Sequence, residues 1–271
     1  MYSMLLLAST FLFAACGDDA DDPQPVDPTT STNTIVDIAG GEDFTTLAAA
    51  LERADLLTTL EGEGPFTVFA PTNDAFDLLL AELELTSLDD VSDAQLTDIL
   101  LNHVVNGKVL STDLEQGYVN TLAPGAEGTN ASLFVNLESG VLLNNRAEVS
   151  TPDVEADNGV VHVIGQVLLV PTVVDAALAN PNFSALVAAL TDSRLAMADF
   201  VGTLNGEGPF TVFAPTNAAF EALLESNEDW SSLADIPAET LEAVLKYHVL
   251  VGSNVTASEI NDGDTPETFE G

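Results

Sequence analysis

Three histidines, a single cysteine and many carboxylates are the side chains of this chain that could do chemistry. His103, His162 and His248 lie far apart in the sequence and lack metal-ligand spacing such as His-x-x-x-His. No nucleophile elbow, phosphate-binding loop or dinucleotide fingerprint occurs either. The sequence therefore predicts a protein without a metal, a cofactor or an enzymatic activity.

Acidic residues are so numerous that no two of them stand out as a general acid and base. The chain has 44 Asp and Glu against 5 Lys and Arg, a formal net charge of −39. This balance argues against nucleic acid and against electrostatic docking on anionic lipid, because both need basic side chains. Three interpretations stay open: a solvated surface that keeps the protein soluble, a halophilic or marine source, and a diffuse cation-binding surface.

The histidines fall within regular apolar patterns. His103 and His248 each end a helical pattern at i, i+3, i+4 and i+7, so we expect both on an apolar helix face. His162 lies inside an alternating strand pattern. We expect His103 and His162 to be structural residues that hold packing through hydrogen bonds. The two helical patterns are Leu96, Ile99, Leu100, His103 and Leu241, Val244, Leu245, His248.

The longest repeat identifies the elements that position these residues. Residues 62–73 read Gly-Glu-Gly-Pro-Phe-Thr-Val-Phe-Ala-Pro-Thr-Asn and return unchanged at 206–217, an offset of 206 − 62 = 144. So long a period indicates a duplicated domain, because solenoid repeats run roughly 20–50 residues. Each copy predicts a turn, a half-buried strand and a helix capped by its Thr. Asp74 follows the first copy and Ala218 the second, so a structural role of Asp74 would be confined to the first copy.

A second distinctive stretch, Asn-Gly-Val-Val-His-Val-Ile at residues 158–164, precedes Val-Leu-Leu-Val-Pro at 167–171. Together with the pair Tyr247–His248, the two stretches resemble the signatures of fasciclin domains over about residues 34–271. The resemblance implies an α+β fold in which each domain is a β-sandwich or wedge-shaped barrel flanked by helices. It also implies surface adhesion or matrix binding, with an extracellular protein or polysaccharide as partner.

The resemblance also implies that a Tyr-His pair takes part in adhesion. Tyr247 and His248 are therefore the candidate adhesion contacts, whereas the first copy has Asn102 in place of the tyrosine. The alternative function is a ligand-binding lipoprotein that carries a small apolar molecule in a domain core. An apolar cavity of at least about 300 Å³ would favour carriage, whereas a filled core with an exposed groove would favour adhesion.

Periodicity and turn signals predict the secondary structure and the domains. Domain 1 spans residues 34–171 and domain 2 spans 172–271. At the helix offset of 145, Gly271 corresponds to Ala126 (271 − 145 = 126), so we expect domain 2 to be C-terminally incomplete. The expected helices of domain 1 are 44–51, 76–83 and 92–103, and its expected strands are 132–136, 141–143, 147–150, 160–164 and 167–170.

The N-terminal residues resemble a bacterial lipoprotein leader. Residues 1–16 hold a short apolar run followed by Phe-Ala-Ala-Cys, although no Lys or Arg precedes that run. The resemblance implies lipidation of Cys16, export and a lipid anchor on the cell envelope or surface; an ordinary signal peptide cut near Ala15 is the alternative. Residues 17–33, rich in Asp and Pro, are expected to form a disordered tether. With a single Cys, no intrachain disulfide can form.

The leader generates a testable prediction. Cys16→Ser should move the protein from the membrane fraction to the soluble fraction, because a serine hydroxyl is not a substrate for thiol lipidation. Metabolic labelling with a fatty-acid analogue measures this directly. Equal labelling of the wild type and the variant would contradict the lipoprotein interpretation.

Overall fold

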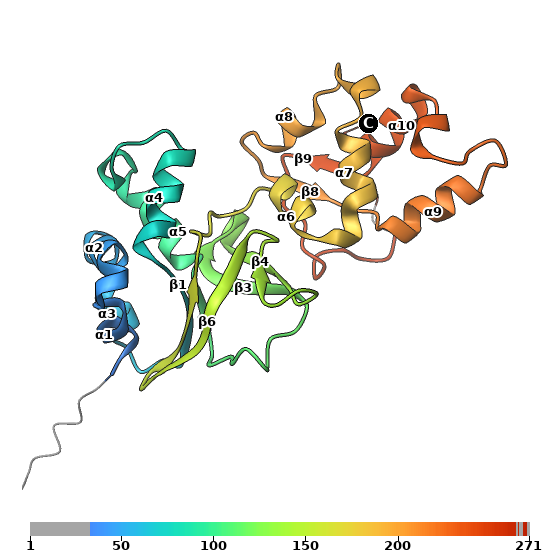
Figure 1. The fold of residues 1–271 in the computed structure, drawn as a ribbon. Coiled ribbons are helices and arrows are strands. Elements are labelled where there is room, and N and C mark those ends of the chain that lie inside the picture. Colours follow the sequence, from blue (N-terminus) through green and yellow to red (C-terminus); the bar gives the residue numbers. More distant parts are fainter. Residues whose placement is uncertain (1–32, 264, 266–267, 270–271) are drawn as a thin grey trace, which may run out of the picture. The chain divides into compact units, whose positions relative to one another are not determined.

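The computed structural model describes residues 33–263, 265 and 268–269. The predicted leader (1–16) and all but the last residue of the predicted tether (17–33) lie outside these residues, so both stay predictions. The two copies of the repeat are described one at a time (Figure 1).

Helices of the first copy begin at capping residues. Thr34, Thr72 and Ser92 each accept a hydrogen bond through the side-chain oxygen from the backbone amide three residues later. Each cap satisfies one of the N–H groups that a helix start leaves unpaired. The elements are α1 (Ile35–Ala39), η1 (Glu42–Phe44), α2 (Thr45–Arg53), α3 (Leu57–Leu60), α4 (Asn73–Glu82), η2 (Leu88–Asp90) and α5 (Asp93–Leu101).

The first copy also contains a seven-stranded sheet, in the order β2-β1-β7-β6-β5-β4-β3. Strand β1 pairs in parallel with β7, and the other pairs are antiparallel. Strands β2 and β3 are therefore the two edges. The strands are β1 (Phe66–Pro71), β2 (Val104–Asn106), β3 (Gly117–Pro124), β4 (Asn130–Asn136), β5 (Leu142–Leu143), β6 (Ala147–Ala156) and β7 (Gly159–Ile164), with the turn η3 (Ala126–Gly128) before β4.

The predicted α+β class is confirmed, and one predicted strand is wrong. Residues 167–170 form no strand, because side chains take their backbone groups. The amide of Leu168 donates to Nε2 of His103 (2.8 Å), and Nδ2 of Asn102 donates to the carbonyls of Leu168 and Leu169. Strands β2 and β3 were not predicted.

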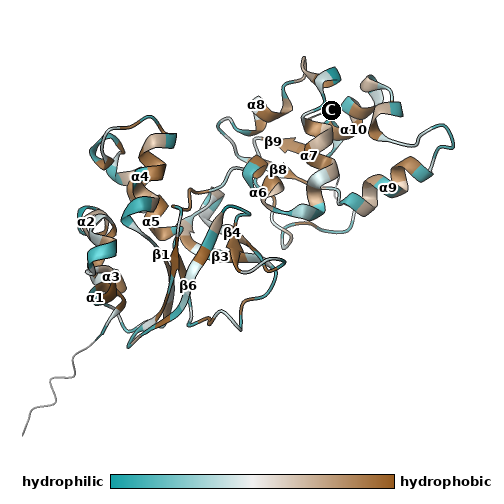
Figure 2. Cartoon of the chain, in the orientation of Figure 1, coloured by the Kyte–Doolittle hydropathy of each residue, from teal (hydrophilic) through white to brown (hydrophobic). Residues whose placement is uncertain are grey.

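The core of the first copy lies on both faces of its sheet. Helices α1–α5 cover one face, where Leu51, Phe76 and Leu100 pack against Val68 of β1. On the other face Phe69 packs among residues of β4, β5 and β7. Figure 2 shows apolar residues along β1 and on the helices beside it. The alternation along β1 therefore sends successive side chains into two separate clusters, as the pleat of a strand requires.

Asn158 joins three segments of this copy. Its Oδ1 accepts from the amide of Ile35 (3.0 Å), while its Nδ2 donates to the carbonyls of Leu60 (2.6 Å) and Gly62 (3.2 Å). Its own carbonyl accepts from the amide of Phe66 (3.0 Å). At the next residue, Gly159, a Cβ would collide with the carbonyl oxygen of Phe66. The Asn-Gly pair is therefore required by close backbone approach as well as by its turn.

The second copy, described by itself, repeats the beginning of this arrangement. Its two-stranded sheet pairs β8 (Phe210–Val212) with β9 (Val249–Val251), the counterparts of β1 and β2. Buried residues such as Leu186, Phe220 and Leu241 form its core. Its other elements are α6 (Val173–Ala179), η4 (Pro181–Phe183), α7 (Ser184–Leu190), η5 (Ser193–Leu195), α8 (Phe200–Leu204), α9 (Asn217–Glu225), η6 (Leu233–Asp235) and α10 (Ala238–Tyr247).

One polar clamp recurs in both copies. Oδ1 of Asn73 accepts from the amide of Thr46 (2.9 Å), and Oδ1 of Asn217 accepts from the amide of Ala185 (2.9 Å). The Nδ2 atoms donate to the carbonyls of Glu42 (2.9 Å) and Pro181 (3.0 Å) in the respective copies. These asparagines end the repeated 12-residue block, so the block encodes a tertiary contact as well as a strand and a cap.

No single helix among the described residues has the length and apolar character to cross a membrane. Within the part of the chain that the structure describes, one bent pair, Val173–Ala179 with Pro181–Leu190, meets the two criteria together, and it turns by 106°.

The Asn158 contacts generate a prediction. Asn158→Ala should destabilise the first copy by about 2–4 kcal/mol, because it leaves buried backbone groups of Ile35 and Leu60 without partners. Hydrogen exchange of the amides of β1 and β7 in the full chain measures this. Asn120→Ala is the control, since exposed Asn120 bonds only the hydroxyl of Ser132, and it should cost less than about 0.5 kcal/mol. Equal losses of protection in both variants would contradict the role of Asn158 in joining these segments.

Candidate functional site

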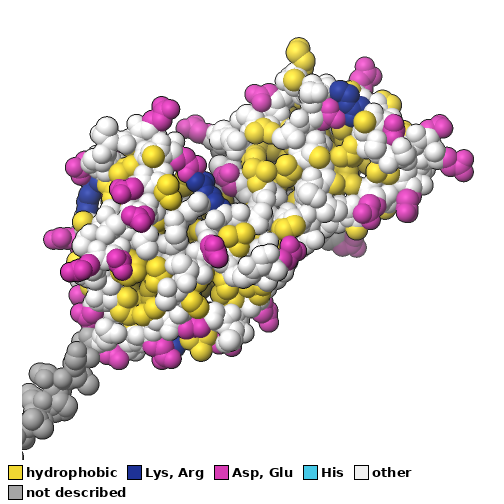
Figure 3. All heavy atoms as spheres, in the orientation of Figure 1, with side chains coloured by type: hydrophobic (Ala, Val, Ile, Leu, Met, Phe, Trp, Pro, Cys, Tyr) yellow, Lys and Arg dark blue, Asp and Glu magenta, His cyan; other side chains and the backbone are white. Residues whose placement is uncertain are grey.

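The charge pattern limits what the surface can bind. Acidic side chains are spread over the face drawn in Figure 3, and basic ones are few. All five basic residues are paired with carboxylates of the same chain. The pairs are Arg53–Asp93 (2.7 Å), Lys108–Glu155 (3.0 Å), Arg194–Asp192 (2.6 Å), Lys246–Glu242 (2.8 Å) and Arg146–Glu82. A partner that carries positive charge therefore meets many free carboxylates.

Two of these arginines were missed by sequence reasoning. Nη1 and Nη2 of Arg53 donate to the carbonyls of Leu88 (2.6 Å) and Val91 (2.5 Å). Arg194 donates in the same way to the carbonyls of Leu233 (2.9 Å) and Ile236 (2.8 Å), at equivalent positions of the second copy (233 − 88 = 145; 236 − 91 = 145). The small number of basic residues in so acidic a chain was the signal that could have identified Arg53 and Arg194. Arg53 holds the turn before α5, and Arg194 holds the turn before α10. Their guanidinium groups are bonded within the chain.

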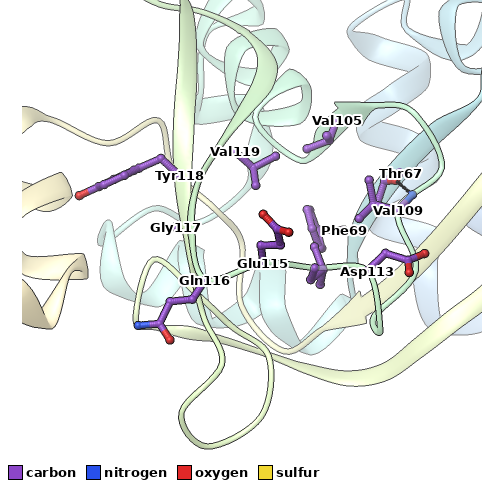
Figure 4. A pocket seen from close by; sticks show the side chains of 11 residues that line it. Thr67, Phe69, Val105, Val109, Asp113, Glu115, Gln116, Gly117, Tyr118 and Val119 are labelled. Carbon is purple, nitrogen blue, oxygen red and sulfur yellow. Dashed lines mark hydrogen bonds between the residues drawn. The ribbon is translucent and has the colours of Figure 1, made fainter.

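A groove of about 420 Å³ lies between β1, β2 and the start of β3 in the first copy (Figure 4). Its lining is mostly apolar, and the exposed residues Asp113 and Glu115 at its border, which we call its mouth, add two carboxylates. In Figure 4 the carboxylate of Glu115 points toward Val119, and that of Asp113 lies on the other side of Phe69. In Figure 4 the side chains of Tyr118 and Gln116 turn away from the hollow. We call this hollow the β2–β3 groove; its apolar lining residues are Phe69, Val105, Val109, Leu114 and Val119.

Polar contacts hold residues 107–111 of the segment that borders the groove. Oγ1 of Thr67 donates to the carbonyl of Gly107 (2.7 Å) and accepts from the amide of Val109 (2.9 Å). The carboxylate of Asp153 accepts from the amide (2.7 Å) and the hydroxyl (2.5 Å) of Ser111. These bonds from Ser111 hold the pKa of Asp153 below its usual range. The groove is therefore bordered by a fixed loop.

His162 takes part in the same support. It is fully buried, and its Nδ1 accepts from the amide of Asp153 (3.1 Å). Nδ1 therefore carries no proton, and the Nε2–H donates to the carbonyl of Val109 (2.9 Å). The ring also stacks on Phe69, with 5.5 Å between centroids. Both nitrogens are engaged by the backbone, which is the arrangement expected of a structural histidine.

His103 is likewise buried, two residues past the end of α5. Its Nδ1–H donates to the carbonyl of Ile99 (2.7 Å), because Nε2 accepts from the amide of Leu168. Burial lowers the pKa of His103 to about 4, against the smaller opposing effect of the Ile99 carbonyl. The neutral ring thus links α5 to the segment after β7.

The candidate adhesion pair lies at the end of α10. The side chain of Tyr247 is exposed (66%) and meets the ring of His248 edge-on, with 6.3 Å between centroids. His248 is half-buried, and its Nδ1 donates to the carbonyl of Val244 (2.6 Å), as His103 does to Ile99. The structure thus separates the two roles: Tyr247 is available for contact, and His248 is engaged in the helix end.

The remaining predicted site residues are not brought together. Asp74 is exposed in the first turn of α4, where a carboxylate favours the helix N-terminus, and no contact of it with a histidine is found among the described residues. Cys16 lies outside the described residues. Within the described part of the chain, no group of three or more His, Cys, Asp or Glu side chains could hold a metal ion.

His103 generates a pH prediction. Its pKa is about 4 in the folded state and 6.5 in the reference state, so unfolding binds a proton between these values. Stability should be full above pH 6.5 and should fall by about 3 kcal/mol as pH drops to 4, at about 1.4 kcal/mol per pKa unit.

Urea denaturation at several pH values measures this effect. His103→Gln is the control: it should be less stable at neutral pH and should lack this part of the pH dependence, while the charges of the other groups stay the same. Parallel pH profiles for the wild type and the variant would contradict the role of His103.

Comparison with known proteins finds several similar chains. The family model described as fasciclin domain matches residues 42–171 and 181–271. A Synechocystis protein, sll1483, is 45% identical over 144 residues, which cover 53% of this chain and 77% of that protein. Human periostin is 34% identical over 231 residues (84% of this chain, 26% of periostin), and pig transforming growth factor-beta-induced protein ig-h3 is 33% identical over 214 (78% and 29%).

The chain therefore spans under a third of the length of periostin and of ig-h3. Among solved structures, the fasciclin domain pair of the insect cell adhesion molecule fasciclin I is similar, with 19% identity, a TM-score of 0.42, and coverage of 86% of this chain and 79% of that one. The family model covers most of the chain in two successive matches, and the chain belongs to the fasciclin domain family, with two tandem fasciclin regions.

Proposed function

We propose that this protein is a non-enzymatic adhesion module that binds an extracellular protein or polysaccharide at a cell surface. One observation carries the proposal: the buried side chains with reactive chemistry are engaged in holding the fold, whereas the groove and Tyr247 are open to a partner. His103 and His162 use both ring nitrogens on backbone groups. Membership of an adhesion and matrix-binding family supports the same function.

The alternative of carriage in a domain core is less well supported. The void between the helices and the sheet of the first copy, beside His103 and Val161, measures only about 10 Å³. That volume holds no small molecule, since ligand pockets run roughly 300–1,000 Å³. The β2–β3 groove is large enough, at about 420 Å³, but it is open and has an acidic mouth. Such a groove fits contact with a partner better than storage of an apolar molecule.

The proposal includes attachment to the membrane through lipid on Cys16. A net charge of −39 opposes electrostatic docking on anionic lipid, so a covalent anchor is the route that the composition allows. The acidic tether predicted for residues 17–33 would then hold the two copies away from the envelope.

Adhesion is tested with beads coated with the full chain, passed over surfaces of defined matrix proteins and polysaccharides. Saturable retention that soluble full chain competes away supports the proposal. Retention equal to that of uncoated beads on every surface would refute it.

Tyr247 generates a prediction for the same assay. Tyr247→Ala should weaken binding about 5- to 30-fold, because exposed tyrosines often dominate interfaces. It should change the unfolding free energy by less than about 0.5 kcal/mol, since the side chain of Tyr247 is exposed. Met197→Ala, at a residue 99% exposed in the same copy, is the matched control and should leave binding unchanged. If the Tyr247→Ala variant binds as strongly as the wild type, Tyr247 is not part of the contact surface.

A further inference from the structure

We infer that the β2–β3 groove binds a lysine side chain of the partner, with the aliphatic stem on the apolar floor and the ammonium group attracted by the carboxylates of Glu115 and Asp113. This inference rests on the proposed adhesion function and narrows its partner to a protein with an exposed lysine.

The floor suits an aliphatic chain. Leu114 and Val105 are buried, Val109 and Val119 are half-buried, and together they form a continuous apolar surface about the hollow. A lysine side chain buries its four methylene groups on apolar surface while its ammonium group stays at a polar boundary. The volume of about 420 Å³ leaves room for the backbone that carries the lysine.

The mouth supplies the complementary charge. Asp113 and Glu115 are exposed, and neither carboxylate has a hydrogen bond or ion pair within residues 33–263. Figure 4 shows the carboxylate of Glu115 on the same side of the strand as Val119, beside Phe69. Lys108, the basic residue adjacent to the lining, is directed to Glu155 of β6 (3.0 Å). The two carboxylates are thus free to pair with a cation from outside.

The chemistry of the groove favours an ammonium group over other occupants. A divalent cation needs more ligands than two exposed carboxylates, and no such cluster exists among the described residues. An acidic polysaccharide would be repelled, and a neutral sugar lacks an aromatic platform because Tyr118 turns away. The loop is held by Thr67, Asp153 and His162, so little ordering is needed on binding.

A competing explanation assigns the same carboxylates to protection of the sheet edge. Strand β3 is an edge strand, and charged side chains beside such edges prevent pairing with other chains. That explanation predicts self-association when the charges are removed and no preference for lysine.

The test titrates the full chain, labelled on valine methyl groups, with three small probes by NMR. The probes are Nα-acetyl-lysine methylamide, its Nε-acetylated form and the norleucine analogue, which share the backbone and differ in the end group. We expect the lysine probe to shift the methyl signals of Val109 and Val119 saturably, with a Kd of about 1 mM for a ligand of this size. The two uncharged probes should bind at least about 3-fold more weakly.

Variants locate the site. Asp113→Asn with Glu115→Gln should weaken the lysine probe about 3- to 10-fold. Asp77→Asn with Glu148→Gln removes the same charge at exposed positions of the first copy outside the groove lining, and should leave the affinity within about 1.5-fold. Equal affinity for the norleucine probe, equal loss in both double variants, or no saturable shift would each overturn the inference. Self-association of the first double variant without a preference for lysine would assign the carboxylates to edge protection.

The bead assay separates this inference from the proposed function. Retention that persists in the Asp113→Asn, Glu115→Gln variant, together with no binding of the lysine probe, would refute the groove and leave adhesion through another surface. Binding of the probe without retention on any surface would support the groove and refute adhesion.

Discussion

Hydrogen bonds from buried side chains to the backbone are the interaction on which the rest of this structure depends. Asn158 is the central example, because one amide group holds the start of α1, the end of α3 and the β6–β7 turn. Without Asn158, the amide of Ile35 and the carbonyl of Leu60 would each be buried without a partner, at a cost of roughly 1–3 kcal/mol. The parallel pairing of β1 with β7 brings these segments together, and it requires a residue without a side chain at Gly159.

The same principle explains how an acidic chain builds a groove. With so few cations, the protein cannot hold its loops through many ion pairs, and it uses Thr67, Asp153 and His162 for the segment beside the groove. The arginines Arg53 and Arg194 are used at one equivalent turn in each copy. Carboxylates at the groove mouth therefore stay unpaired, and this is the basis on which we propose a cationic partner.

The two copies show how one sequence block behaves in different surroundings. Phe69 is buried (1% exposed) against His162, whereas Phe213, at the same place in the repeated block, is 40% exposed. Both copies nevertheless keep the asparagine clamp and the histidine bond at the helix end. Local contacts thus recur with the block, while burial depends on which strands are present beside it.

The sequence by itself determined the family, the α+β class, the duplication and the helix caps at Thr72 and Ser92, because these depend on local spacing and on long motifs. It also predicted a cap at Thr216, but the side chain of Thr216 makes no cap hydrogen bond. It did not predict β2 or β3, and it placed a strand at 167–170, where Asn102 and His103 take the backbone groups that a strand would need. The sequence also did not predict the β2–β3 groove. Val105, Leu114 and Val119 are ordinary apolar residues in the sequence, and only the approach of β2 to β3, together with the loop held by His162, makes them one surface. Long-range hydrogen bonds decide such placements, and their partners lie too far apart in the chain for periodicity to reveal them.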